Sequence, residues 1–327
     1  ITSDNINEVY PTYYPPRRSP KECYEQIIAD LTDAEKYAPD NDNSDRTKMT
    51  KTVAQAMLAK VYAEKEVQDY DKVITYADKV IKTTGVELED SYETLWGYDE
   101  TTKDCLKRNT KEGILEVHWT TGGGNWETWM YGRQLDNWDY YFTWAKWITP
   151  SRDIISDFEK EGDEIRKNQA IVYYACTWSN YYPASNYPFM YKLRSSYSNI
   201  YWIRLADIIL MKAEAEAYKG NLDESAKLVN QIRKRAKLKE LTSDKTNSKE
   251  AMIEAVLHER RLELAFEGER WFDLCRNNKV EKYLNGIDNR DKGRIKQVKL
   301  FDSNSYLLPI PQTALDQNTN LVQNPGY

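Results

Sequence analysis

The stretch ERRLELAFEGERWFDL, residues 259–274, decides the fold, because it sets a dense group of charges on an apolar helical stripe. The apolar side chains that recur at helical spacing here and just before are Ile253, Val256, Leu257, Leu264 and Trp271. Gly268 interrupts the pattern, so we expect one helix to end near it and RWFDL to begin another turn. The aromatic rings of Trp271 and Phe272 are expected to help build a core.

The charges of this stretch could belong to a catalytic site or to a set of ion pairs. Glu259, Glu263 and Glu267 are spaced by four residues, and Arg260 and Arg261 lie within one helical turn of the first two. A general acid needs a raised pKa, which burial or a like charge provides, whereas a neighbouring arginine lowers the pKa of a carboxyl group. We therefore predict structural ion pairs rather than catalysis.

Helical patterns extend outward from this stretch in both halves of the chain. Residues 20–37, 49–65 and 70–82 carry apolar side chains on one face each, with Cys23, Ile27, Leu31 and Ala34 aligned in the first. Residues 201–236 contain two helical patterns joined by a turn at Gly220, and Ile203 is expected to lie in the first of these helices. The pairs are similar to tetratricopeptide units, which must stack to bury their apolar faces. The predicted fold is mainly α, a repeat scaffold.

One domain with three regions is predicted. Residues 20–85 form a helical repeat region, and residues 201–327 form a second helical repeat and a C-terminal lock. Between them, residues 86–200 lose helical periodicity and form a loop-rich excursion with a few short strands, such as residues 114–119 and 169–178. Binding surfaces often lie on loops of this kind.

Composition narrows the class of protein. The chain has 327 residues, of which 40% are hydrophobic and 30% charged, with a net charge of −6. This net negative charge argues against sequence-independent binding of nucleic acid, which needs clustered Lys and Arg. The four cysteines are widely spaced and there are only two histidines, so the sequence predicts no zinc or redox motif, no metal site and no cofactor.

Aromatic content gives the strongest functional signal. The chain has 10 Trp and 25 Tyr but 6 Phe, and six of the Trp fall within residues 119–147. Sugar rings stack their C–H faces on aromatic planes, while their hydroxyl groups bind amide, carboxylate and guanidinium groups. We predict ligand contacts by Asn125, Trp126, Trp129, Tyr131, Arg133, Asp136, Trp138, Asp139, Tyr140 and Trp144, and by a second cluster of Trp178, Tyr181 and Tyr182. Other rings are expected in the core, first among them Trp119, Phe142 and Trp147.

Residues 259–274 together with LLPIPQTALDQNTNLVQNPGY, residues 307–327, resemble the SusD/RagB family of outer-membrane nutrient-binding lipoproteins of Bacteroidota. Further stretches agree in the order of the family: SPKECYEQIIADLTDAEKYAP, MTKTVAQAMLAKVYAE, TPSRDIISDFEKEG and YWIRLADIILMKAEA. The resemblance implies a tetratricopeptide scaffold whose loops bind a glycan, and a binding protein rather than a hydrolase. It also implies a cell-surface location on the outer membrane, a lipid anchor as the only membrane contact, and a TonB-dependent SusC-like transporter as partner.

The sequence departs from the family at its start. Family members carry a substantial part before the SPKECY-like helix, with the lipid-bearing cysteine, whereas 19 residues precede it here. Cys23 lies within the predicted helix and is not the lipidated position. The N-terminal part of the family fold is therefore expected to be absent from this chain.

Two other functions stay open on the residues alone. A glycoside hydrolase needs two carboxylates that flank a cleft, and Asp136 and Asp139 are the pair to test. A scaffold that binds peptides or proteins would use the same aromatic loops as its contact surface.

Overall fold

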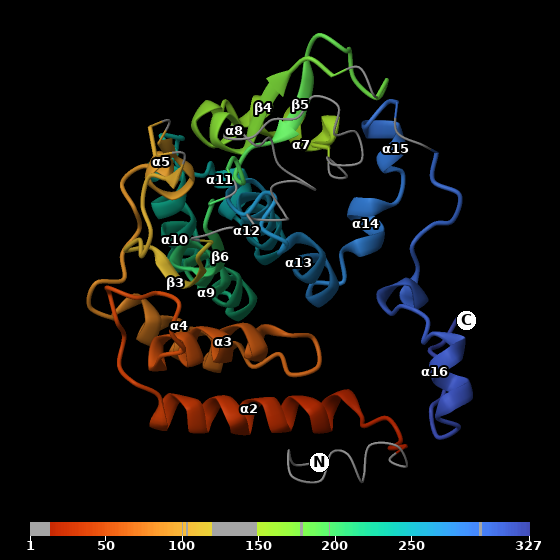
Figure 1. The fold of residues 1–327 in the computed structure, drawn as a ribbon. Coiled ribbons are helices and arrows are strands. Elements are labelled where there is room, and N and C mark those ends of the chain that lie inside the picture. The colour runs from red at the N-terminus through yellow and green to blue at the C-terminus, as the bar shows by residue number, and fades with distance from the viewer. Residues whose placement is uncertain are drawn as a thin grey trace.

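The structure is a computed structural model, which describes residues 14–99, 101–102, 104–119, 149–176, 179–195, 197–293 and 296–327. The described part is mainly helical, as the sequence predicts (Figure 1). The N-terminal helices form layers at the base of the view, and short helices and strands lie at the opposite end. The longer helices are α2 (Pro20–Tyr37), α3 (Lys51–Ala63), α4 (Tyr70–Ile81), α7 (Arg152–Glu161), α9 (Leu205–Lys219), α10 (Leu222–Arg235) and α12 (Lys249–Glu263).

Helix α9 is the centre of the scaffold, because it packs against α3, α4, α10 and α12. It is rich in alanine, and Ala206, Ala213 and Ala217 are fully buried in the main core. Small side chains let neighbouring helices approach closely, and the helix pairs α3–α4 and α9–α10 both contribute to this core. Gly220 ends α9 in a left-handed conformation with φ of 86°, where glycine has no steric penalty. The predicted pairing of helices is thus confirmed.

Two details of the helical prediction are wrong. Residues 201–204 do not open the helix but belong to strand β6 (Ile200–Arg204), and Ile203 pairs with Leu115 of β3 (Gly113–Val117). In α2, Cys23 and Ile27 are exposed, and the half-buried face carries Tyr24, Ile28, Leu31 and Ala34 instead. The apolar stripe of α2 is therefore rotated by one residue at its start, because Ile28 rather than Ile27 packs against α3.

Strands are short and occur as three two-stranded antiparallel sheets among the described residues. The β3–β6 sheet leads directly into α9, which places Arg204 at the end of a strand and at the start of a helix. The other two sheets lie in the region that was predicted to be rich in loops. Their strands are β1 (Tyr98–Asp99), β2 (Asp104–Cys105), β4 (Ile171–Tyr174) and β5 (Tyr187–Met190).

Short helices connect and complete the scaffold. Along one side of the molecule the chain runs from α14 to α16 towards the C-terminus (Figure 1). The short helices are α5 (Tyr92–Trp96), α8 (Glu164–Ala170), α11 (Ser243–Thr246), α13 (Arg270–Arg276), α14 (Val280–Leu284), α15 (Ile287–Arg290), the 3-10 helix η2 (Ser303–Tyr306) and α16 (Gln312–Gln317).

The C-terminal segment contacts the first described residues. Asn318 and Asn320 donate hydrogen bonds to the carbonyl oxygens of Pro15 and Tyr14, at 3.0 and 2.7 Å. Arg17 donates to Oδ1 of Asn324 at 2.7 Å. Amide side chains thus connect two segments about three hundred residues apart in sequence.

Candidate functional site

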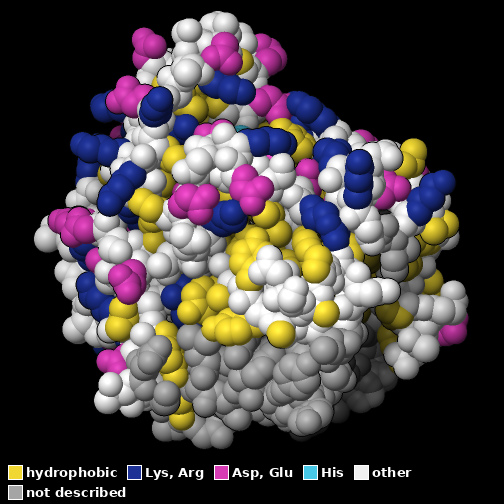
Figure 2. Space-filling view, turned by 90° about the horizontal axis from the view of Figure 1, so that it is seen from above, with side chains coloured by type: hydrophobic (Ala, Val, Ile, Leu, Met, Phe, Trp, Pro, Cys, Tyr) yellow, Lys and Arg dark blue, Asp and Glu magenta, His cyan; other side chains and the backbone are white. Residues whose placement is uncertain are grey.

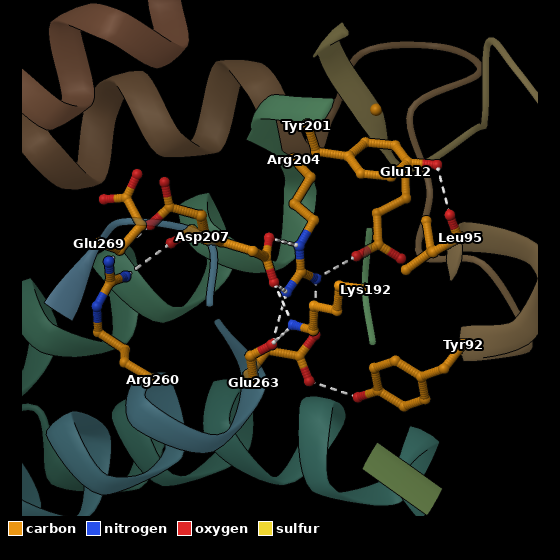
Figure 3. Close-up of polar contacts among 12 residues, drawn as sticks. Tyr92, Leu95, Glu112, Lys192, Tyr201, Arg204, Asp207, Arg260, Glu263 and Glu269 are labelled. Atoms are coloured by element: carbon orange, nitrogen blue, oxygen red, sulfur yellow. Dashed lines mark hydrogen bonds and ion pairs between the residues drawn. The ribbon is translucent and has the colours of Figure 1, made fainter. Parts of the chain in front are cut away.

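The charges of residues 259–274 lie in a buried network between α12, β6, α10 and α8. Arg204 lies between Glu112 and Glu263, and Tyr92 and Lys192 approach Glu263 from other elements (Figure 3). The guanidinium of Arg204 donates to Glu112 at 2.8 Å and to Glu263 at 2.7 Å. Arg235, Arg166 and the Tyr92 hydroxyl also donate to the Glu263 carboxylate. Glu263 therefore accepts hydrogen bonds from three guanidinium groups and a phenol at a buried position.

A second buried group surrounds Arg260. Its guanidinium donates to Asp207 at 2.7 Å and to Asp273 at 2.9 Å. Lys60 of α3 also binds Asp207 at 2.6 Å and reaches Glu269 at 2.8 Å. The network thus joins α3, α9, α12 and the turn before α13.

The predicted ion pairing is confirmed, but its partners differ from those expected. Arg260 and Arg261 do not pair with Glu259 or Glu263; Arg261 binds Asp153 and Asp157 of α7. The carboxylate partners of these arginines all lie on helices other than α12. The ion pairs therefore connect separate helices rather than stabilise α12 alone. The expected core role of Phe272 is wrong, since its side chain is 57% exposed, while Trp271 is half-buried against Phe301 and Tyr306.

The pKa directions fit a structural role for Glu263. Burial alone would raise its pKa, but Arg235, Arg204 and Arg166 together hold the pKa well below its usual range. Glu269 differs: burial and the neighbouring Asp207 raise its pKa against the attraction of Lys60. Glu269 therefore departs from the expectation that a neighbouring arginine lowers the pKa of the carboxyl groups in this stretch. Both carboxylates are paired with cations, Glu263 with Arg204 and Glu269 with Lys60.

Most of the predicted ligand residues lie outside the described part of the chain. This holds for Asn125, Trp126, Trp129, Tyr131, Arg133, Asp136, Trp138, Asp139, Tyr140, Trp144 and Trp178, and for Phe142 and Trp147, which were expected in the core. Trp119 is described and half-buried. Among the predicted ligand residues, Tyr181 and Tyr182 are described.

Tyr181 and Tyr182 line an open hollow of about 890 Å³ together with Arg152, Ser179 and Asn180. The two rings meet edge to face with centroids 4.9 Å apart, and the Arg152 guanidinium lies over both, 4.5 and 4.1 Å from the ring centres. Cation–π contact of this kind fixes the rings in place. Burial raises the pKa of the Tyr182 hydroxyl, which donates to the Pro150 carbonyl at 2.7 Å.

This hollow adjoins the two described residues that follow the aromatic segment in the chain. Thr149 and Pro150 are the first described residues after residues 120–148, and they contact Tyr187 and Tyr182. Figure 2 shows the molecule from above, the end that carries β4, β5 and α7 in Figure 1, and hydrophobic side chains gather on this face. Thr149 and Pro150, which follow the aromatic segment in the chain, therefore lie beside the second cluster.

The described residues offer no group of three or more His, Cys, Asp or Glu that could hold a metal ion. In the loop at residues 40–45, Asn41 and Asn43 accept hydrogen bonds from the guanidinium of Arg46, which also donates to the Gly85 carbonyl. Over the same described ranges, no helix is long and apolar enough to cross a bilayer.

Comparison with known proteins gives one consistent family. A sequence model of the SusD family matches residues 34–327. SusD-like protein P2 of Formosa agariphila is 27% identical over 339 aligned positions, which cover 94% of this chain and 65% of that protein. SusD-like protein P38 of the same organism is 39% identical over 136 positions, 40% of this chain and 25% of that protein. The chain thus spans less than two thirds of the length of either relative.

Solved structures agree on the fold. A SusD superfamily protein from Bacteroides vulgatus has a TM-score of 0.74 at 24% identity, covering 97% of this chain and 70% of its own. A laminarin-binding SusD-like protein has a TM-score of 0.70 at 24% identity, covering 95% of this chain and 70% of its own. The family match over residues 34–327 and these shared folds lead to one conclusion: the chain belongs to the SusD family.

Proposed function

We propose that this protein binds glycan chains at the cell surface and delivers them to a TonB-dependent SusC-like transporter in the outer membrane. The observation that carries the proposal is the match to the SusD family over residues 34–327. A solved protein of the same fold is described as laminarin-binding, so the fold is compatible with glycan capture. The transporter, the outer-membrane location and the lipid anchor come from the resemblance to the family.

The binding surface that we propose combines residues 125–144 with Tyr181 and Tyr182. Two features support it. The aromatic segment alternates stacking rings with amide, carboxylate and guanidinium groups, and its described C-terminal border contacts the hollow that Tyr182 lines. A glycan that stacks on several rings would gain affinity one sugar at a time, so binding should strengthen with chain length.

Binding without turnover is the proposed mode. The carboxylates of residues 259–274 pair with guanidinium and ammonium groups, and Glu263 is too strongly stabilised as an anion to donate a proton. Glycoside hydrolysis by Asp136 and Asp139 remains the enzymatic alternative. Release of reducing sugar by the purified protein, lost in Asp136→Asn, would favour hydrolysis over capture.

Replacement of Trp126, Trp129 and Trp138 together by alanine should weaken retention on the ligand polysaccharide by at least about tenfold, because the stacking of sugar C–H faces on indole rings is lost at three positions. Retention can be measured by affinity electrophoresis through gels that contain each polysaccharide of a panel. The control is Tyr37→Ala, which removes an exposed ring of α2 that is far from both clusters in sequence. Thermal unfolding of each variant checks the scaffold. Unchanged retention in the triple variant, with an intact fold, would remove this surface from the proposal.

A peptide panel run beside the polysaccharides tests the remaining alternative. The same rings could hold peptide side chains, so a peptide-binding scaffold predicts retention of peptides and none of the glycans.

A further inference from the structure

A second cavity lies away from the Tyr181–Tyr182 hollow, between the turn that joins α12 to α13 and the strands β5 and β6. Its volume is about 460 Å³, within the range of small-molecule sites. Three indoles line it, from Trp96, Trp202 and Trp271, although they come from three separate parts of the chain. Trp202 is 67% exposed, so its ring is available at the surface.

Two residues on the wall of this cavity each have one buried polar atom without a hydrogen-bond partner among the described residues. Trp96 is 5% exposed and Asn199 is 3% exposed, and both line the cavity. Neither the indole N–H of Trp96 nor Oδ1 of Asn199 has a hydrogen-bond partner within the described ranges. The amide orientation of Asn199 is fixed, because its Nδ2 donates to the Lys107 carbonyl and to Glu116. One donor and one acceptor without a described partner thus belong to residues that line the same cavity, and leaving such groups unpaired in a buried site costs stability.

Charged side chains of both signs line the cavity. Four cations line it, Lys192, Arg260, Arg261 and Arg270, against two carboxylates, Glu267 and Asp273. The first three cations each bind carboxylates. Arg270 differs, because its Nη1 donates to the Leu257 carbonyl at 2.9 Å and its guanidinium lies 4.8 Å from the Tyr283 ring centre, and no carboxylate of the described residues pairs with it. Burial and the nearby Arg261 lower the pKa of Arg270 to about 10, so a bound anion would relieve an unfavourable charge.

We propose that this cavity is a separate ligand site, which takes the carboxylate-bearing end of a short acidic saccharide. Arg270 holds the carboxylate through its free donor atoms, since a guanidinium fork matches a carboxylate. The indoles of Trp202 and Trp271 stack on the sugar ring, and Trp96 and Asn199 bind its hydroxyl groups. A peptide C-terminus carries the same anion, but its usual capture depends on backbone N–H groups, whereas side chains supply the donors here. The inference rests on the proposed function in that the ligand is taken to be a saccharide.

Arg270→Gln is the decisive variant. Glutamine keeps a donor for the Leu257 carbonyl but removes the cation. Binding of a trigalacturonate, of the same trisaccharide with its carboxyl groups reduced to alcohols, and of a tripeptide with a free C-terminus is measured by isothermal titration. We expect the wild-type protein to bind the uronate at least about tenfold more tightly than the reduced sugar, and Arg270→Gln to abolish this difference. Trp202→Ala, at an exposed position, should weaken both sugars while leaving thermal unfolding unchanged.

Two controls isolate the cavity. Arg18→Gln removes one positive charge, as Arg270→Gln does, but at an exposed arginine. Phe272→Ala removes an exposed ring that does not line the cavity. Both should bind the uronate as the wild type does. Equal affinity of the wild type for the charged and reduced sugars would overturn the proposal, as would binding of the tripeptide alone.

Failure of this inference is distinguishable from failure of the proposed function. In one outcome, the variant that lacks Trp126, Trp129 and Trp138 loses polysaccharide retention and the wild type shows no selectivity for the uronate. This outcome refutes the cavity as a ligand site and supports the proposed binding surface. In the other outcome, the protein selects the uronate through Arg270 but retains no polysaccharide. This outcome supports the cavity as a ligand site and refutes the proposed binding surface.

Discussion

Glu263→Ala should lower the free energy of unfolding by about 3 to 5 kcal/mol, the range for breaking a buried ion pair on one side. The substitution leaves Arg166, Arg204 and Arg235 without the carboxylate on which all three converge. It also leaves the Tyr92 hydroxyl without its acceptor. Equilibrium unfolding in urea, followed by circular dichroism, gives the change directly.

Glu250→Ala is the matched control, because Glu250 lies on the same helix α12 and is exposed. Its effect should stay within about 0.5 kcal/mol. A Glu263→Ala protein as stable as the Glu250→Ala protein would show that the three arginines find other acceptors, and the structural role assigned to the network would be wrong.

Stability should also fall as pH decreases, by roughly 2 kcal/mol or more between pH 7 and pH 3. The Glu263 carboxyl has a folded pKa well below its ordinary value of 4.5, set by Arg235, Arg204 and Arg166 against the effect of burial. A lowered folded pKa contributes stability that is present above the unfolded pKa and lost as pH falls through the folded pKa. Glu161 and Glu254 act in the same direction with pKa values of about 2, but their partial exposure makes their share smaller.

Burial raises the pKa of Glu269 and Asp163, which therefore offset part of this loss in acid. Urea unfolding at pH 7, 4.5 and 3 measures the sum. The difference in stability between wild type and Glu263→Ala should shrink as pH falls, because the wild type loses the contribution that the variant lacks. The difference between wild type and Glu250→Ala should stay constant. A constant difference for both variants would contradict the assignment of acid sensitivity to Glu263.

Helix positions were predictable from sequence because they depend on local apolar periodicity. The spans of α3, α4, α10 and α12 follow such periods closely. Residues 201–204 were misassigned since Ile203 fits a helical period by coincidence, while its pairing with Leu115 depends on a segment far away in sequence. The rotated face of α2 has a similar cause, because the position of α3 decides which of Ile27 and Ile28 is covered.

Ion pairs and cavities were less accessible to sequence reasoning. Local spacing predicted pairs within one helix, but Arg260 reaches Asp207, 53 residues earlier. The second cavity was missed because Trp96, Trp202 and Arg270 belong to three distant segments, and no spacing rule relates them. The high Trp content is visible in the sequence, but it predicts a ligand site at residues 119–147, where six of the Trp fall together.

The Glu263 network has a consequence for how the protein is made. Arg204 meets Glu263 across 59 residues and Arg166 across 97. A ribosome exposes these arginines well before it synthesises their acceptor, so the nascent chain carries unmatched cations until residue 263 has emerged. Native docking of α8, β6 and α10 must then wait for α12, so the packing of these elements is completed only once the chain extends to residue 263 of 327.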